Sequence, residues 1–260
     1  MRRRTLVRVL AGSLPVAIAG CTGSADDDAV STDSHGEPST DESNGASDPA
    51  DDDATDPDEP ELTTLESITA VAGRYDDDSQ TFSGSGSEQT SEFELRDSIT
   101  VFIAEHDVDG RFEPELRNES RLRAFLPIRE FDSYAGAAAV GVQADTYLLD
   151  VIAAGDWSVE IAQPVSPEEE IHQLPVEVSG DGQDVVGPVE LTGEATVTGR
   201  HDGEGGFGVE VLDESGRGEH GQVARVFDEV DEFNGQETIE MNAVCWIHVD
   251  AAASWTIEIE

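Results

Sequence analysis

Trp157-Ser-Val-Glu-Ile161 and Trp255-Thr-Ile-Glu-Ile259 are two closely similar stretches of the sequence. In both, apolar side chains occupy every second position, which is the period of a β-strand that buries one face. The stretches Tyr147–Val151 and Cys245–Val249 alternate in the same way. This pattern predicts the same kind of strand in two separate parts of the chain.

The similarity extends outward from these strands. Other segments match in the same order: 82–88 with 178–184, 93–95 with 189–191, 106–112 with 201–207, and 134–142 with 233–241. A preserved order with a nearly constant offset is typical of an internal repeat, and loops absorb the small drift. Glycine-rich and aspartate-rich turns separate short strands in both copies. We therefore expect an all-β protein with two tandem antiparallel β-sandwich modules of jelly-roll or immunoglobulin-like type.

Composition places the module boundaries. Residues 62–164 form the first predicted sandwich and residues 176–260 the second. The proline-rich stretch 165–175 is the predicted connector between them. Residues 22–61 are acidic and rich in Ser, Thr, Gly and Pro, with almost no large apolar side chain. Such a segment cannot bury enough surface to offset chain entropy, so residues 21–61 are predicted to be a disordered acidic tether.

Four motifs carry a family resemblance. The second copy contains Ser179-Gly-Asp-Gly182, then Val186-Gly-Pro-Val-Glu-Leu191, then His201-Asp-Gly-Glu-Gly-Gly-Phe207, and ends in the strand that starts at Trp255. This order resembles a module of exported haloarchaeal lipoproteins, over about residues 78 to 260. The resemblance implies a surface β-sandwich unit without an established chemistry, so it assigns no catalytic residue. The first copy departs from the pattern at Arg111 and Pro114 and between residues 121 and 132.

The N-terminus has the features of an export signal. Residues 1–20 combine arginines, a weakly apolar stretch and small residues, which indicates a cleaved signal peptide. Arg3 and Arg4 resemble the twin-arginine export motif. Ile18-Ala-Gly-Cys21 resembles a lipobox, which implies that the thiol of Cys21 carries a lipid. This interpretation predicts anchoring on the extracellular face of the cell membrane through that lipid. The alternative is an ordinary secretory signal with an incidental cysteine.

The charge of the chain makes a nucleic-acid partner unexpected and suggests an environment of high salt. The chain has 58 Asp and Glu against 14 Arg, with no lysine, and its formal net charge is −44. Nucleic-acid binding is excluded as a default because phosphates need a basic surface. At molar salt the Debye length falls to about 3 Å, so dense carboxylates are screened. Adaptation to molar salt is therefore expected, with an acidic surface for a basic partner as the alternative.

The two His-Asp turns are candidate calcium sites. Asp107 and Asp109 in one copy, and Asp202 and Glu204 in the other, have the spacing that begins an oxygen-rich calcium loop. The alternative is a plain hairpin turn, since Asp and Gly also suit turn geometry. No other cofactor is expected. The adjacent His106 and the equivalent histidine of the second copy lack partners at zinc-ligand spacing, so they are predicted to be exposed turn residues.

Aromatic and cysteine residues complete the candidates. Trp246 and His248 alternate away from Cys245, which indicates an exposed ligand patch near loops 121–132 and 217–231. Cys245 itself is predicted to be a buried, unpaired thiol. Trp157 and Trp255 are expected in core or edge packing rather than in sugar-stacking platforms.

The sequon Asn118-Glu-Ser makes Asn118 a candidate glycosylation site.

The expected function is display rather than catalysis. The sequence predicts a lipid-anchored, salt-adapted surface protein with a non-enzymatic interaction or envelope-structural role, whose surface protein or glycan partner it does not identify. The alternative is an extracellular lipoprotein that binds a carbohydrate or another small solute. An enzyme is not expected, because no G-x-S-x-G elbow or comparable activating arrangement occurs.

Overall fold

The computed structural model describes residues 62–69, 79–118, 123–216 and 223–260. All of them lie in one compact unit, Thr55–Glu260. The described residues are mostly β-strand, in several sheets whose pairings are antiparallel with one exception at β1, and contain a single 3-10 turn, η1 (Glu168–Glu170). The expected all-β class is confirmed. The signal peptide and the tether lie outside the described residues.

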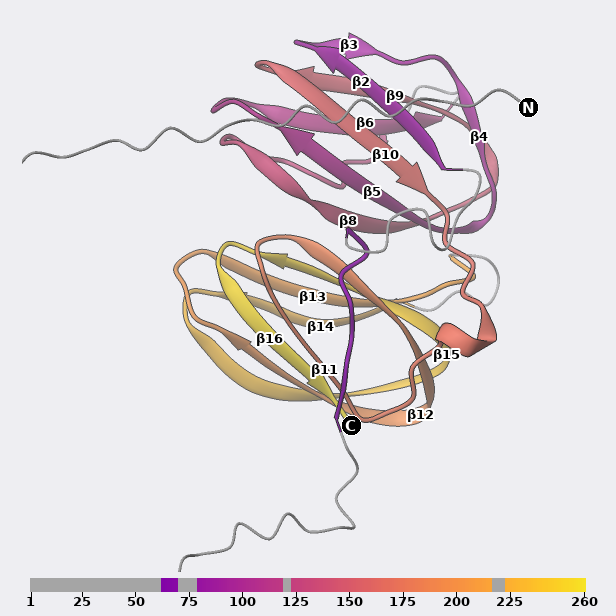
Figure 1. Ribbon diagram of the computed structural model, residues 1–260, viewed down its shortest axis with the longest axis vertical. Coiled ribbons are helices and arrows are strands. Elements are labelled where there is room, and N and C mark those ends of the chain that lie inside the picture. The colour runs from indigo at the N-terminus through magenta and orange to yellow at the C-terminus, as the bar shows by residue number, and fades with distance from the viewer. Residues whose placement is uncertain (1–61, 70–78, 119–122, 217–222) are drawn as a thin grey trace, which may run out of the picture. The chain divides into compact units, whose positions relative to one another are not determined.

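Strands between residues 80 and 162 form two antiparallel sheets (Figure 1). One has the order β2-β10-β5-β8, and the other has the order β3-β9-β6-β7 with β4 also paired to β9. Their bounds are β2 (Gln80–Ser85), β3 (Glu88–Gln89), β4 (Phe93–Leu95), β5 (Ser98–His106), β6 (Phe112–Asn118), β7 (Arg123–Phe125), β8 (Tyr134–Val142), β9 (Asp145–Ala153) and β10 (Asp156–Ala162). We call these strands the N-terminal half.

The remaining strands form one seven-stranded sheet in the order β1-β11-β16-β12-β15-β13-β14. Their bounds are β1 (Thr63–Thr64), β11 (Val176–Asp181), β12 (Asp184–His201), β13 (Gly206–Asp213), β14 (Val223–Val230), β15 (Phe233–Ala251) and β16 (Ser254–Ile259). We call β11 to β16 the C-terminal half. The connection between the halves includes η1, within the predicted connector 165–175.

Strand pairing follows the same scheme in both halves. In one, β10 lies between β2 and β5, with Trp157 opposite His106. In the other, β16 lies between β11 and β12, with Trp255 opposite His201. The long strands β12 and β15 take the places that β4 with β5, and β8 with β9, share in the N-terminal half. The repeated sequence segments therefore occupy matching registers.

Each half buries its own apolar cluster. The N-terminal cluster includes Phe102, Phe112 and Val159, all fully buried, and the C-terminal cluster includes Phe207 and Ile257. Alternation along β10 and β16 turns one side of each strand inward, as the period-two pattern predicts. Burial of these side chains is the main term that stabilises both halves.

The first strand, β1, lies in the predicted first module, residues 62–164, but pairs with a strand of the second half. Thr63 and Thr64 of β1 pair in parallel with β11, and the side chain of Leu65 is buried in the C-terminal cluster. The backbone N–H of Ile68 donates to the carbonyl of Val185 at 2.8 Å. These residues were assigned to the first module by sequence, yet they complete the sheet of the second half.

A third apolar cluster joins the halves. It contains Ile99, Val101 and Ala139 from β5 and β8, with Leu212 and Trp246 from β13 and β15. Glu214 sits beside this cluster, and its backbone carbonyl accepts hydrogen bonds from the N–H of Ile99 and the hydroxyl of Ser98. The two halves are therefore packed against each other through buried apolar side chains and two hydrogen bonds to the Glu214 carbonyl.

Candidate functional site

The two His-Asp turns connect strands that do not pair with each other. Asp107 and Asp109 follow β5, Asp202 and Glu204 follow β12, and all four are exposed. Because β5 does not pair with β6, nor β12 with β13, the plain hairpin interpretation is wrong. Within the described ranges, no group of three His, Cys, Asp or Glu could hold a metal ion. The turns thus show no calcium site built from described residues.

His106 and His201 are core residues, so the prediction that they are exposed is wrong. Their side chains are 1% and 0% exposed and stack on Phe112 and Phe207 at centroid distances of 4.9 and 5.2 Å. Each histidine lies at the end of a strand and continues its inward parity. Among described residues, neither ring nitrogen of His106 has a hydrogen-bond partner, whereas Nδ1 of His201 lies 2.8 Å from the carbonyl of Asp231.

Trp246 is fully buried, so the predicted exposed aromatic patch is wrong at this residue. Its side chain does point away from Cys245, as the alternation indicates, but the opposite face is covered by Ile99 and Ala139 of the N-terminal half. The indole Nε1 donates to Oε2 of Glu214 at 3.0 Å. Trp246 therefore joins the halves and does not present a ligand surface.

His248, the other member of the predicted patch, lines a cleft of about 740 Å³ between the two halves. Tyr134 on β8 and Gln183 in the turn between β11 and β12 line the same cleft. The Tyr134 hydroxyl donates to Oε1 of Gln183 at 2.8 Å. Nε2 of Gln183 lies 3.1 Å from Nε2 of His248 and 3.3 Å from the carbonyl of Pro127. Three side chains from both halves thus form one hydrogen-bonded chain.

The hydrogen bonds among Tyr134, Gln183 and His248 determine which ring nitrogen of His248 carries the proton. The carbonyl of Pro127 can only accept a hydrogen bond, so the group of Gln183 that faces it must be the amide nitrogen. That nitrogen also faces Nε2 of His248, which must then accept, and the proton of the neutral imidazole lies on Nδ1. Burial lowers the pKa of His248 to about 4, which keeps the ring neutral. Within the described structure, no residue accepts from Nδ1.

Carboxyl groups flank the hydrogen-bonded chain. Desolvation raises the pKa of Glu130, with a smaller contribution from the nearby charge of Asp250. Desolvation also raises the pKa of Asp250 and of the Tyr134 phenol. Arg225 lines the cleft too, but it is paired with Asp228 at 3.1 Å. The cleft therefore combines three hydrogen-bonded neutral side chains with the half-buried carboxyl group of Glu130 and the exposed one of Asp250.

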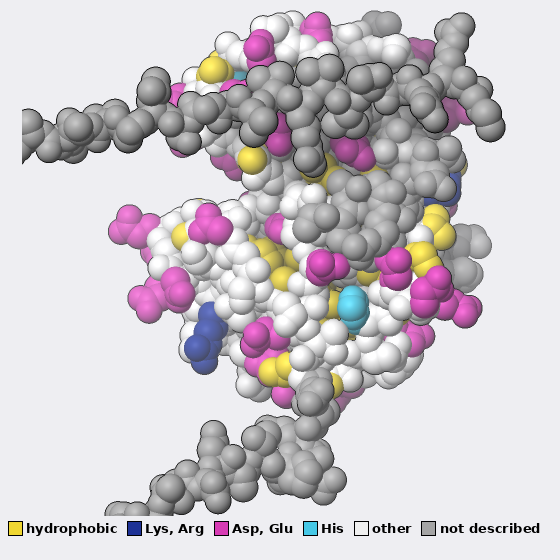
Figure 2. All heavy atoms as spheres, in the orientation of Figure 1, with side chains coloured by type: hydrophobic (Ala, Val, Ile, Leu, Met, Phe, Trp, Pro, Cys, Tyr) yellow, Lys and Arg dark blue, Asp and Glu magenta, His cyan; other side chains and the backbone are white. Residues whose placement is uncertain are grey.

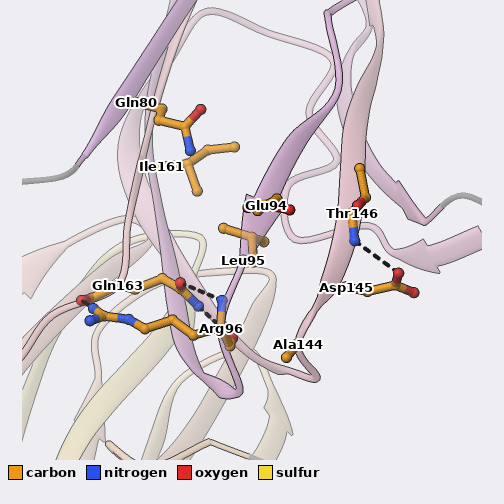
Figure 3. A pocket seen from close by; sticks show the side chains of 9 residues that line it. All are labelled: Gln80, Glu94, Leu95, Arg96, Ala144, Asp145, Thr146, Ile161 and Gln163. Atoms are coloured by element: carbon orange, nitrogen blue, oxygen red, sulfur yellow. Dashed lines mark hydrogen bonds between the residues drawn. The ribbon is translucent and has the colours of Figure 1, made fainter.

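A second pocket of about 540 Å³ lies within the N-terminal half (Figure 3). Oε1 of the buried Gln163 accepts from the backbone N–H of Arg96 at 2.9 Å, and its Nε2 donates to the Arg96 carbonyl at 2.9 Å. Nε2 also donates to Oγ1 of Thr100, and the Arg96 guanidinium donates to the Gln163 carbonyl. These groups fasten β4 to the end of β10, so the pocket is assigned a structural role.

The remaining candidates have these positions. Asn118 is half-buried at the end of β6, and the next two residues of its sequon lie outside the described ranges. Cys245 is buried as predicted, and desolvation raises the pKa of its thiol to about 12. Arg3, Arg4 and Cys21 lie outside the described residues. No helix in the described ranges is both long and apolar enough to cross a bilayer.

Sequence reasoning found one member of the cleft and missed the others. His248 was singled out because it alternates away from Cys245. Tyr134 and Gln183 carry no local signal, since they meet only when the two halves pack together. A weak signal existed in β5, which is apolar at both parities from Ile99 to Ala104 and so predicts a strand covered on both faces.

Comparisons with known proteins assign no family. No family model matches the chain, and no curated protein matches it. Among solved structures, one similar chain is described as a cupin 2 conserved barrel domain protein from Leptotrichia buccalis. It is 10% identical, with 77% of this chain and 96% of that chain covered and a TM-score of 0.21. A similarity of this size carries no argument about activity.

Proposed function

We propose that this protein is a lipid-anchored, salt-adapted surface protein that displays a folded unit for a non-enzymatic interaction or envelope-structural role. The observation that carries the proposal is the order of segments along the chain. The lipobox-like Cys21 is followed by an acidic stretch to residue 61, and the first strand starts at Thr63. The predicted anchor, the predicted spacer and the folded unit thus follow one another directly along the sequence.

Anchoring is tested by cell fractionation in molar salt. The chain with Cys21→Ser should appear in the medium, because the lipid that holds it on the membrane can no longer be attached. The neighbouring Thr22→Ser serves as a matched control and should remain with the membrane fraction. Equal membrane retention of the two variants would contradict anchoring through Cys21.

The finer fold proposal is that the halves are duplicated sandwich modules. Matching glycines support it, because each allows a tryptophan ring to lie against the neighbouring strand. A Cβ on Gly84 would lie 2.7 Å from Cζ2 of Trp157 and still nearer to the flexible carboxyl group of Glu88, and one on Gly180 would lie 2.4 Å from Cζ2 of Trp255. The indole N–H groups donate to the carbonyls of equivalent turn residues at 3.0 and 2.8 Å. Gly84→Ala and Gly180→Ala should both lower the melting temperature, and a neutral effect of either would contradict the equivalence.

The distribution of charge supports the salt-adapted part of the proposal. Acidic side chains are spread over the visible face, and basic ones are few (Figure 2). Arginines that pair with acids, such as Arg117 with Asp150 at 3.2 Å, neutralise only a small part of this charge. Excess carboxylates repel one another in dilute solution and are screened in brine.

The cleft favours a second candidate function, an extracellular lipoprotein that binds a small solute. The supporting observation is the chain formed by Tyr134, Gln183 and His248, because convergent polar groups with perturbed pKa values in a cavity are typical of ligand sites. Isothermal titration calorimetry with sugars and amines in molar salt tests this candidate. If no solute produces a binding heat, the solute-binding candidate is rejected and display remains as the proposed function.

A further inference from the structure

We propose that the cleft between the halves binds a neutral polyhydroxylated solute, a polyol or sugar, through hydrogen bonds to His248 and the carboxyl groups beside it. The inference rests on the second candidate function and names the chemical class of its ligand. It starts from the size of the cleft, about 740 Å³, which falls within the range of small-molecule sites.

The cleft offers donors and acceptors at fixed positions. Gln183 and Tyr134 hold the imidazole of His248 from the Nε2 side, so its orientation is set before a ligand arrives. The N–H at Nδ1 remains as a donor for a hydroxyl oxygen. Glu130 and Asp250 supply carboxyl oxygens that accept from hydroxyl groups. Adjacent hydroxyls of a polyol can use a donor and an acceptor together, which suits this arrangement.

Salt decides between a neutral and a cationic ligand. The cleft is acidic, so an organic cation would be attracted in dilute solution. In molar salt the long-range part of that attraction is screened, because the Debye length is about 3 Å, and abundant monovalent cations compete for the same carboxyl groups. A hydrogen bond made by an uncharged hydroxyl group does not depend on long-range attraction and loses less under these conditions. In molar salt, the cleft therefore gains more selectivity from hydroxyl groups of a ligand than from an ammonium group.

The structure also limits how a sugar could be held. The aromatic side chains that line the cleft, Tyr134 and Phe207, are 9% and 1% exposed. Their ring faces are thus covered, so the described lining contains no stacking platform for a pyranose. Recognition would depend on hydrogen bonds, and flexible polyols should bind as well as ring sugars of similar size.

The test is a nuclear magnetic resonance titration of the full chain in molar KCl. Trehalose and sorbitol are the neutral probes, and choline is the cationic probe. The ring resonances of His248, assigned through His248→Gln, report directly on the cleft. We expect a saturable shift of His248 with both neutral probes and none with choline. His172 is half-buried and outside the lining of the cleft, so its resonances should not move.

Matched variants complete the test. His248→Phe should weaken binding about tenfold, the loss expected for one neutral hydrogen bond at the upper end of its range. His172→Phe should leave the affinity unchanged, and amide spectra verify that both variants fold. A shift with choline alone would overturn the ligand class and keep the cleft as a binding site. Silence with all three probes, or unchanged affinity in His248→Phe, would overturn the site, while membrane anchoring is tested separately by fractionation.

Discussion

Removal of the Trp246 side chain tests the contact between the halves. Trp246 is fully buried in the cluster that joins them, against residues such as Ile99 and Ala139. Truncation of a buried tryptophan to alanine removes its contacts and leaves a cavity, which costs about 3 to 5 kcal/mol of unfolding free energy. The predicted loss applies to Trp246→Ala in molar KCl, the salt concentration at which we expect the protein to be most stable.

A milder substitution removes the hydrogen bond but keeps much of the packing. Trp246→Phe keeps an aromatic ring but removes the N–H that donates to Glu214. A hydrogen bond to a charged group contributes about 1.5 to 3 kcal/mol. Glu214 also accepts from the backbone N–H and the hydroxyl of Ser166, so it is not left without partners. We therefore expect Trp246→Phe to lose at least about 1.5 kcal/mol, since the lost hydrogen bond adds to the loss of part of the buried ring, but less than Trp246→Ala.

Thermal unfolding followed by circular dichroism measures both effects. For a chain of this size, each kcal/mol shifts the melting temperature by about 2 to 4 °C, so Trp246→Ala should lower it by roughly 6 to 20 °C. The melt should also broaden or divide into two steps, because each half keeps its own core. Phe131→Ala is the control, since that side chain is 57% exposed. A shift for Trp246→Ala no larger than that for Phe131→Ala would refute the packed contact.

Further predictions concern salt, histidines and the thiol. Lowering KCl from molar to about 0.1 M should lower the melting temperature, and unchanged melts would contradict salt adaptation. His106→Phe should be neutral or stabilising in urea titrations, because it removes unpartnered buried nitrogens, whereas His201→Phe also loses a hydrogen bond and should be less favourable. The Cys245 thiol should react with Ellman's reagent only after unfolding, since burial raises its pKa to about 12; rapid reaction in the native state would contradict this. The depressed pKa of His248 means that the unfolded chain binds the extra proton more readily, so the stability difference between wild type and His248→Gln should shrink as pH falls from about 6.5 through about 4; a constant difference would contradict the burial of this ring.

The strands were predictable because their signal is local. The alternation at Trp157 and at Trp255 correctly predicts β10 and β16, each with one buried face. The repeated blocks correctly pointed to equivalent registers, since Trp157 and Trp255 pair with the matching histidines. Period-two alternation reflects burial against the apolar cluster of the strand's own half, so a single sequence suffices to detect it.

Contacts between distant segments were not predictable in the same way. Alternation placed Trp246 on the correct face but could not show that the N-terminal half covers that face. It also could not show that β1 pairs with β11, since nothing in two exposed threonines indicates which strand they pair with. His106 was wrongly predicted to be exposed. The residues that follow it are typical of a turn, whereas its position in the alternation of β5 places its side chain on the inward face. Of the cleft, only His248 could be found from the sequence, because Tyr134 comes from the opposite half and Gln183 from a turn far away in the sequence.

Anchoring through Cys21 is the central part of the proposed function, and the mass of the mature N-terminus tests it directly. The protein would be purified from membranes in molar salt, digested, and its N-terminal peptide identified by mass spectrometry. The proposal predicts a chain that begins at Cys21 with a thioether-linked lipid on that residue. A chain that begins elsewhere, or that carries an unmodified Cys21 thiol, would contradict it.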